Sequence, residues 1–236
     1  MTYEQYLIKW LQDQNKKTKT NGFIVGISGG VDSALVGALI KKAMPKNSLG
    51  VIMPIGKMDD YEDAQMIIKH LDLTSQVVDL TKTFTQITKV LKVSSKSSLI
   101  NIKPRLRMTT LYALAQELNY LVIGTDNADE WLLGYFTKYG DGGVDLLPIV
   151  HLTKNEVRKM AKSLNIPDKI INKVPSAGLF SGQTDEEELG FSYEMVDKYL
   201  KNEPIPDDIK HKIIAQSNKT AHKREPILSP LHLQKF

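Results

Sequence analysis

Residues 26–35 read GISGGVDSAL and continue the apolar run GFIVGI of residues 22–27. The apolar run predicts a buried strand. Beyond the glycines, apolar residues recur at helical spacing, which predicts a helix that opens near Asp32. Glycine allows a ligand to approach the backbone closely, and the N–H groups of such a turn and helix start form a nest for an anion. The stretch therefore predicts a phosphate-binding loop between a strand and a helix.

The acidic residue in this loop, Asp32, sets it apart from the common nucleotide loops. The chain contains neither G-x-x-x-x-G-K-[ST] nor G-x-G-x-x-G, so the P-loop and Rossmann interpretations fail. A carboxylate beside a phosphate nest repels the ligand unless a cation lies between them, and Mg²⁺ binds carboxylate and phosphate oxygens together. The alternative is that Asp32 caps the helix and the glycines form a tight turn.

The composition indicates a soluble globular chain of 236 residues, of which 42% are hydrophobic and 25% charged. A chain of this length can bury its core as a single domain spanning 1–236. The 31 Lys and Arg residues against 27 Asp and Glu leave a net charge of +4, which permits an anionic ligand without indicating a nucleic-acid-binding protein.

The absence of Cys excludes disulfides, thiolate zinc sites and cysteine nucleophiles. No apolar run reaches the length of a membrane span, and the N-terminal segment carries acids rather than a signal-peptide pattern. We therefore expect a cytoplasmic protein.

Short apolar runs alternate with segments of helical periodicity over the first half of the chain. Such alternation predicts an α/β fold, a doubly wound parallel sheet with helices on both faces. Beyond Gly124, glycine and polar residues cluster around one more amphipathic helix, and no linker indicates a second domain. The further expected strands lie at 51–53, 77–78 and 120–124, and the expected helices at 61–70, 84–91, 105–118 and 157–164.

Two segments admit two interpretations each. Apolar residues of the stretch 3–11 fall on one stripe of a helix, which either docks on the core of its own chain or contacts a second subunit. The stretch 209–224 carries five Lys or Arg residues and no acid. It forms either a solvated face or part of a ligand site.

The run Ser28-Gly29-Gly30-Val31-Asp32-Ser33 resembles the pyrophosphate-binding loop of the ATP pyrophosphatase, or PP-loop, superfamily. Members of this superfamily cleave ATP between the α- and β-phosphates, adenylate a carbonyl oxygen, and replace AMP with a nitrogen or sulfur nucleophile. The resemblance implies an adenine-nucleotide-hydrolase-like PP-loop fold. It also implies that the loop holds the leaving pyrophosphate, which explains why no Lys follows the glycines.

Later segments are similar to NAD synthetases and follow that family's order over essentially the whole chain. They are NIKPRLRM (101–108), GTDNADE (124–130), GYFTKYGDGGVDLLP (134–148), PSAGL (175–179), GQTDEEELG (182–190) and HKR (222–224). The resemblance implies a ligase that forms a C–N bond. In such a reaction ATP adenylates the nicotinate carboxylate of deamido-NAD (nicotinic acid adenine dinucleotide), pyrophosphate leaves, and ammonia displaces AMP to give NAD.

The resemblance also assigns roles to individual residues. The residues that match ATP contacts are Gly26, Ile27, Ser28, Gly29, Gly30, Val31, Asp32, Ser33, Thr125, Lys154 and Ser176. The residues that match deamido-NAD contacts are Arg105, Lys138, Asp145, His222 and Lys223. Asp32 and Glu130 match ligands of Mg²⁺, and Asp141 matches the base that takes a proton from the incoming ammonium. Pro104 departs from the Ala of that family and is expected to bend the start of its helix, and Trp131 is bulkier than expected.

Ordinary structural interpretations compete with these roles when each residue is taken singly. The lysines and arginines are explained as solvated cations, Glu130 as a first-turn acid that faces the helix dipole, and Asp141 and Asp145 as turn residues between glycines. Their joint order and spacing favour the functional roles.

Two rival functions remain open at this point. Another PP-loop enzyme, such as an adenylating amidase-type ligase or a tRNA sulfurtransferase, is one, and a non-catalytic nucleotide-binding module is the other. The resemblance further implies a homodimer, use of free ammonia rather than glutamine, and no nucleic-acid or membrane partner. The glycine-rich and acidic stretch Val174–Gly190 is expected to be a lid that orders over bound ligands.

Overall fold

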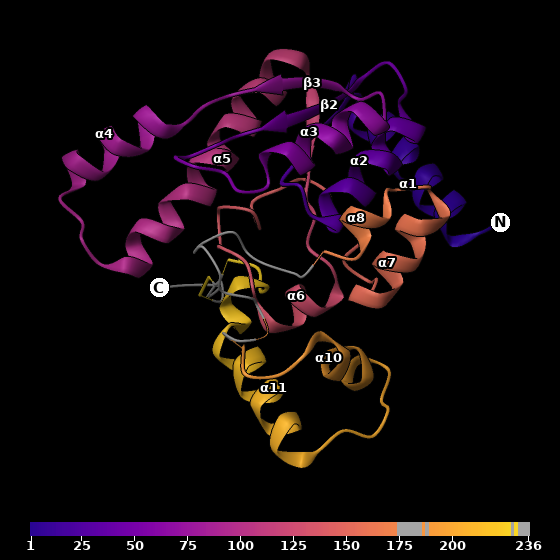
Figure 1. The fold of residues 1–236 in the computed structure, drawn as a ribbon, viewed down its shortest axis with the longest axis vertical. Helices are drawn as coiled ribbons and strands as arrows, with labels where there is room; N and C mark the ends of the chain where they lie inside the picture. Colours follow the sequence, from indigo (N-terminus) through magenta and orange to yellow (C-terminus); the bar gives the residue numbers. More distant parts are fainter. Residues whose placement is uncertain (174–185, 187–188, 228, 231–236) are drawn as a thin grey trace, which may run out of the picture.

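Four parallel strands form the central sheet of the computed structural model, which describes residues 1–173, 186, 189–227, 229 and 230 (Figure 1). The strands are β1 (Gly22–Gly26), β2 (Ser48–Ile52), β3 (Thr74–Val77) and β4 (Tyr120–Ile123), in the order β3-β2-β1-β4. In the register of the sheet, Phe23 lies opposite Ser48 of β2 and Leu121 of β4. The predicted parallel sheet is confirmed.

Helices cover both faces of the sheet because the central strands bury side chains on both sides. Phe23 and Val25 of β1 belong to one core cluster, whereas Ile24 belongs to the other. The first face is covered by α1 (Tyr3–Thr18), α2 (Val31–Ala43), α3 (Tyr61–His70), α7 (Lys154–Ser163) and α8 (Asp168–Ile171). The second is covered by α4 (Thr81–Leu91) and α5 (Lys96–Leu118). The doubly wound arrangement is confirmed.

A third group of helices packs below the sheet in Figure 1. It contains α6 (Ala128–Leu133), α10 (Tyr193–Leu200), α11 (Asp207–Lys219) and the short 3₁₀ helix η1 (Ala221–Lys223). Leu133, Val196 and Ile213 are fully buried in its small core. The basic stretch 209–224 is thereby folded against α6.

Two expectations about helices are modified by tertiary packing. The helix expected at 105–118 begins at Lys96, and Pro104 lies buried inside it. In α1, Leu7 and Leu11 are buried in the core, whereas Tyr3 and Tyr6 are exposed and stack on one another with ring centroids 5.7 Å apart. Docking on the chain's own core is therefore confirmed for the leucines. Within the described part of the chain, no helix is long and apolar enough to cross a membrane.

The strand order creates a topological switch point between β1 and β4. The chain moves from β1 to β2 on one side, and β4 returns to the other side of β1. In open parallel sheets, ligands bind in the crevice outside the carboxyl ends of two such strands. The loop after β1 contains the predicted phosphate nest, and the loop after β4 contains residues 124–127.

Candidate active site

The loop between β1 and α2 has a shape that only glycine allows at one position. Gly29 has a φ of +93°, and a Cβ atom there would lie 2.7 Å from the carbonyl oxygen of Asp60. The hydroxyls of Ser28 and Ser33 lie 3.1 Å apart, and Ser33 also donates to the carbonyl of Gly30 at 2.9 Å. The backbone N–H groups of Ser28 and Gly30 also donate within the loop, each at 3.3 Å to a serine hydroxyl. These bonds brace from inside the loop that is predicted to form the phosphate nest.

Asp32 is not the cap of α2, so that alternative is wrong. Gly30 occupies the cap position, where no side chain accepts from the first N–H groups of the helix, and Asp32 is the second residue of the helix. The side chains of Ile27 and Val31 are buried in the core, which leaves their backbone groups as the part of them that a ligand can contact.

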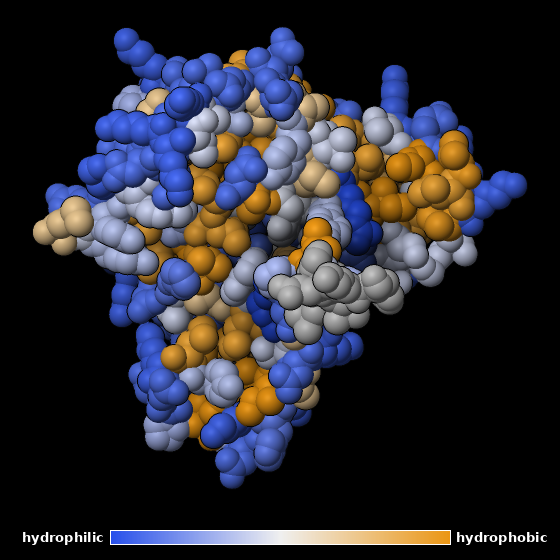
Figure 2. Space-filling model, turned by 180° about the vertical axis from the view of Figure 1, so that it is seen from behind, coloured by the Kyte–Doolittle hydropathy of each residue, from blue (hydrophilic) through white to orange (hydrophobic). Residues whose placement is uncertain are grey.

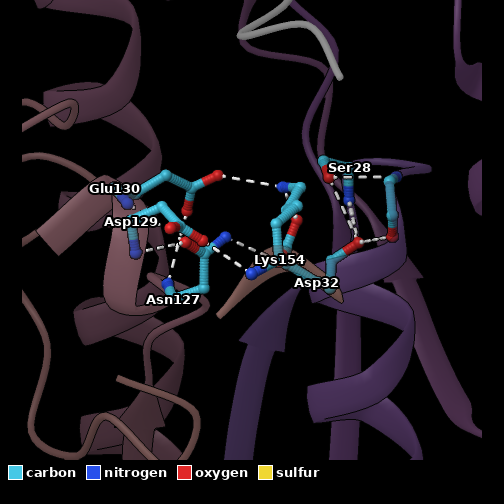
Figure 3. Close-up of polar contacts among 8 residues, drawn as sticks. Ser28, Asp32, Asn127, Asp129, Glu130 and Lys154 are labelled. Carbon is cyan, nitrogen blue, oxygen red and sulfur yellow. Dashed lines mark hydrogen bonds and ion pairs between the residues drawn. The ribbon is translucent and has the colours of Figure 1, made fainter. Parts of the chain in front are cut away.

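Lys154, the first residue of α7, reaches between two acids that come from different elements (Figure 3). Its ammonium lies 2.6 Å from Oδ2 of Asp32 and 3.1 Å from Oε1 of Glu130. Its side chain is only 4% exposed. Burial acts to lower the pKa of Lys154, but the two carboxylates outweigh it, so the pKa lies above its ordinary value. Lys154 is therefore charged in this site.

Asn127 and Asp129 hold this ion-pair group in place. Asn127 caps α6 by accepting from the backbone N–H groups of Asp129 and Glu130, and its Nδ2 donates to Oδ1 of Asp32 at 2.9 Å. Asp129 accepts from the backbone N–H of Lys154 at 2.6 Å. The starts of α2, α6 and α7 are thus joined through three side chains.

The two acids around Lys154 fit a shared cation. Their oxygens both lie within 3.1 Å of one ammonium nitrogen, and burial raises the pKa of Glu130 to about 7 despite the opposing effect of Lys154. Among the described residues, no group of three or more His, Cys, Asp or Glu side chains is placed to hold a metal ion. A metal here would therefore combine these two carboxylates with phosphate and water oxygens, as Mg²⁺ usually does.

Four of the residues expected to bind deamido-NAD lie together. Arg105 donates to the carbonyl of Lys138 at 3.3 Å, and Lys138 donates to the carbonyl of His222 at 2.5 Å. The ammonium of Lys223 donates to the carbonyls of Gly134 and Phe136. These contacts bring α5, the loop after α6 and η1 together.

Asp145 occupies a different position, where it stabilises the end of the sheet. Its carboxylate accepts from the N–H of Val122 at 2.8 Å and from the hydroxyl of Tyr112 at 3.0 Å.

Asp141 accepts from the N–H of Thr137 at 2.9 Å. Although the residue is exposed as a whole, desolvation by the surrounding protein raises its pKa.

Thr125, which is partly exposed, lies in the loop after β4. Ser176 and most of the expected lid Val174–Gly190 lie outside the described residues.

Sequence reasoning missed three residues of this site: Asp126, Asn127 and Asp129. A signal for Asn127 was present, because Asn127 and Glu130 have the spacing of a capping box, which the structure contains. The hydrogen bond between Asn127 and Asp32 joins residues that are 95 positions apart. No local sequence pattern could therefore predict it.

Comparison with known proteins now identifies the family. The family model described as NAD synthase matches residues 3–227. The chain belongs to the NAD synthase family. The NH₃-dependent NAD⁺ synthetase of Mycoplasmopsis pulmonis is 50% identical to it over 99% of this chain and 92% of that protein.

Two solved structures share the fold over nearly the full length of both chains. The NMN synthetase of Francisella tularensis is 37% identical, with a TM-score of 0.92 and 97% of each chain covered. The NH₃-dependent NAD synthetase of Campylobacter jejuni, solved with a nitrate ion, is 30% identical, with a TM-score of 0.80 and coverage of 99% of this chain and 100% of that one. Membership of the NAD synthase family favours an NAD synthetase over a tRNA sulfurtransferase or a non-catalytic module.

Proposed function

We propose that this protein amidates deamido-NAD to NAD with ammonia and ATP, through a nicotinyl-adenylate, and releases AMP and pyrophosphate. One observation carries the proposal. The loop 26–33 and the ion-pair group Asp32–Lys154–Glu130 lie together at the switch point of the sheet. This arrangement is found in a chain whose curated relatives are NH₃-dependent NAD⁺ synthetases.

The residues of the site have distinct tasks in the first step. The loop 26–33 holds the pyrophosphate part of ATP, and Thr125, Lys154 and Ser176 complete the ATP site. Asp32 and Glu130 would hold Mg²⁺, which would neutralise phosphate charge. Lys154 supplies a fixed positive charge in a poorly hydrated position, where a preorganised cation stabilises developing charge.

The second step uses the cluster around the loop 134–143. Arg105, Lys138, His222 and Lys223 would position deamido-NAD, and we keep Asp145 in this role as well. Asp141 would take a proton from ammonium, which frees the nitrogen lone pair to attack the adenylated carboxyl carbon.

The test is a product assay with ATP, Mg²⁺, ammonium and either deamido-NAD or nicotinic acid mononucleotide. We expect NAD and AMP with deamido-NAD. The likeness to an NMN synthetase makes amidation of the mononucleotide the second candidate, and a higher kcat/KM with the mononucleotide would favour it. Release of ADP instead of AMP would contradict both candidates.

Glutamine is expected to yield no NAD with this chain as sole protein. Larger NAD synthetases resemble this domain fused to a glutaminase, and the nucleophile of that glutaminase is a Cys. This sequence contains no Cys. The measurement is NAD formation from glutamine freed of ammonium, with ammonium chloride as the positive control. NAD formed from purified glutamine would refute the expectation.

Replacing Asp141 with Asn is expected to lower NAD formation on the order of 100-fold, as the loss of a general base usually does. Pyrophosphate release from ATP and deamido-NAD should fall much less, because adenylation needs no base for ammonium. Both rates are followed in the same reaction. Equal loss of the two rates would contradict the role of Asp141.

A homodimer forms part of the proposal. Hydrophobic side chains gather over α4 at the right of Figure 2, where Val90 is 77% exposed and Leu91 53%, and exposed apolar patches of this kind often mark subunit contacts. Light scattering is expected to give twice the chain mass of 26.5 kDa, and charged replacements at Val90 and Leu91 should reduce the measured mass.

The cytoplasm is the proposed compartment, since ATP and a dinucleotide are the substrates.

A further inference from the structure

Asp126 is a buried acid in the active site to which the proposed mechanism assigns no task. It lies in the loop after β4, next to Asn127, and is 5% exposed. Its Oδ2 has no hydrogen-bond partner among the residues that the structure describes. Buried polar atoms in native proteins are nearly always paired, so one left over at a ligand site points to a missing partner.

Two other buried acids also carry an oxygen with no hydrogen-bond partner in the described part of the chain, but their situation differs. Asp129 and Asp197 interact with each other, and burial together with Asp197 raises the pKa of Asp129 to about 8. A proton held by Asp129 can be donated to the carboxylate of Asp197, which gives both side chains a partner. Asp126 has no comparable acid bonded to it within the described residues, so the same explanation does not apply.

The charges around Asp126 are mostly negative. After burial itself, Asp141 has the largest effect, followed by Glu130 and Asp32, and together they raise the pKa of Asp126 well above its ordinary value. Lys223 acts in the opposite direction. The ionised form of Asp126 therefore needs a cation that this arrangement leaves out.

The described cations nearby are already engaged elsewhere. Lys154 lies between Asp32 and Glu130, and Lys223 donates to two backbone carbonyls. Arg107, which acts on Asp141, donates to the carbonyl of Met53 at 3.0 Å. Asp126 and Asp141 thus act on each other electrostatically, and no cation among the described residues forms an ion pair with either of them, in a site whose nucleophile arrives as a cation.

The chemistry of amide formation requires two proton acceptors. Ammonium carries four protons and the product amide nitrogen carries two, so two protons must leave. The base already assigned, Asp141, accepts one of them. A second acceptor is needed, and the buried Oδ2 of Asp126, which has no hydrogen-bond partner among the described residues, can serve as it.

We propose that Asp126 and Asp141 together bind ammonium and that each carboxylate accepts one of the two protons it loses. This inference rests on the proposed function. The ammonium first transfers one proton to the carboxylate of Asp141. The electron pair of the broken N–H bond stays on nitrogen and forms the bond to the adenylated carboxyl carbon. The bond from that carbon to the phosphate oxygen then breaks, AMP departs with the electron pair, and the second proton passes to Asp126.

The test compares ammonium with hydroxylamine in Asp126→Asn. Hydroxylamine is largely unprotonated at neutral pH and sheds only one proton when it forms a hydroxamate, so it needs neither the cation site nor the second acceptor. We expect kcat/KM for ammonium to fall about 100-fold and that for hydroxylamine to fall no more than about threefold. Asn has the shape of a protonated Asp, so the fold should persist, and pyrophosphate release should stay near that of the native protein.

Asp197→Asn is the matched control, since Asp197 is a comparably buried acid on α10 that accepts from the N–H of Asn155 and interacts with Asp129 rather than with Asp126 or Asp141. It should leave the ratio of the two nucleophiles unchanged. Equal losses with both nucleophiles in Asp126→Asn, or no loss with ammonium, would overturn the proposal. If hydroxylamine is not a substrate of the native protein, the ratio of NAD formed to pyrophosphate released provides the same comparison. Failure of the native protein to release pyrophosphate and AMP at all would instead contradict the proposed function.

Discussion

Replacing Asp32 with Asn is expected to lower turnover on the order of 100-fold or more while the chain still folds. The carboxylate of Asp32 lies beside the phosphate nest and beside Lys154, where it would share Mg²⁺ with the phosphates. An amide oxygen is a much weaker ligand for this cation. The Mg²⁺ concentration that gives half-maximal turnover, measured at saturating ATP, should rise.

The local hydrogen bonds also predict a cost in stability for Asp32→Asn. Asn127 cannot turn its amide round, because its Oδ1 accepts from two backbone N–H groups of α6. The new side chain must therefore point its own NH₂ group at either Asn127 or Lys154, which are both donors. We expect the free energy of unfolding to fall by about 1–3 kcal/mol, measured by urea denaturation.

Asp63→Asn is the control for this variant. Asp63 is likewise a first-turn acid paired with lysines, but its partners are Lys169 and Lys173. It should lose some stability and keep its turnover. Near-normal turnover with normal Mg²⁺ dependence in Asp32→Asn would refute the metal role of Asp32.

Replacing Lys154 with Met is expected to affect both stability and activity. Removing the ammonium leaves the two largely buried carboxylates of Asp32 and Glu130 side by side. Breaking such a buried group by deleting one partner costs about 3 kcal/mol or more. Activity should fall on the order of 100-fold, because the fixed positive charge that faces ATP is lost.

Added Mg²⁺ provides a second measurement for Lys154→Met. A divalent cation can occupy the place of the lost ammonium, so Mg²⁺ should raise the melting temperature of this variant more than that of the native protein. Lys173→Met is the control, since Lys173 also joins two acids but is 26% exposed and should cost only about 1 kcal/mol. Equal stability losses in the two variants would contradict the central position of Lys154.

The sequence alone determined the type of fold and the family. Apolar periodicity and glycine punctuation act over a few residues, so they predicted the strand at 22–27, a loop, a helix that opens near Asp32, and the parallel sheet, all of which the structure contains. The loop chemistry around Gly29 was equally local, since its positive φ and its close approach to Asp60 demand glycine.

The tertiary structure decided how the charged residues are paired. Lys154 and Asp32 are 122 positions apart, and nothing in either segment indicates that one ammonium joins two acids. Likewise, Lys223 donates to backbone carbonyls, Asp145 stabilises the end of β4, and Oδ2 of Asp126 has no hydrogen-bond partner among the described residues. The physical reason is that these pairings depend on where the loops after β1 and β4 meet and on how much water the surrounding helices exclude. Both arise only when distant parts of the chain pack together.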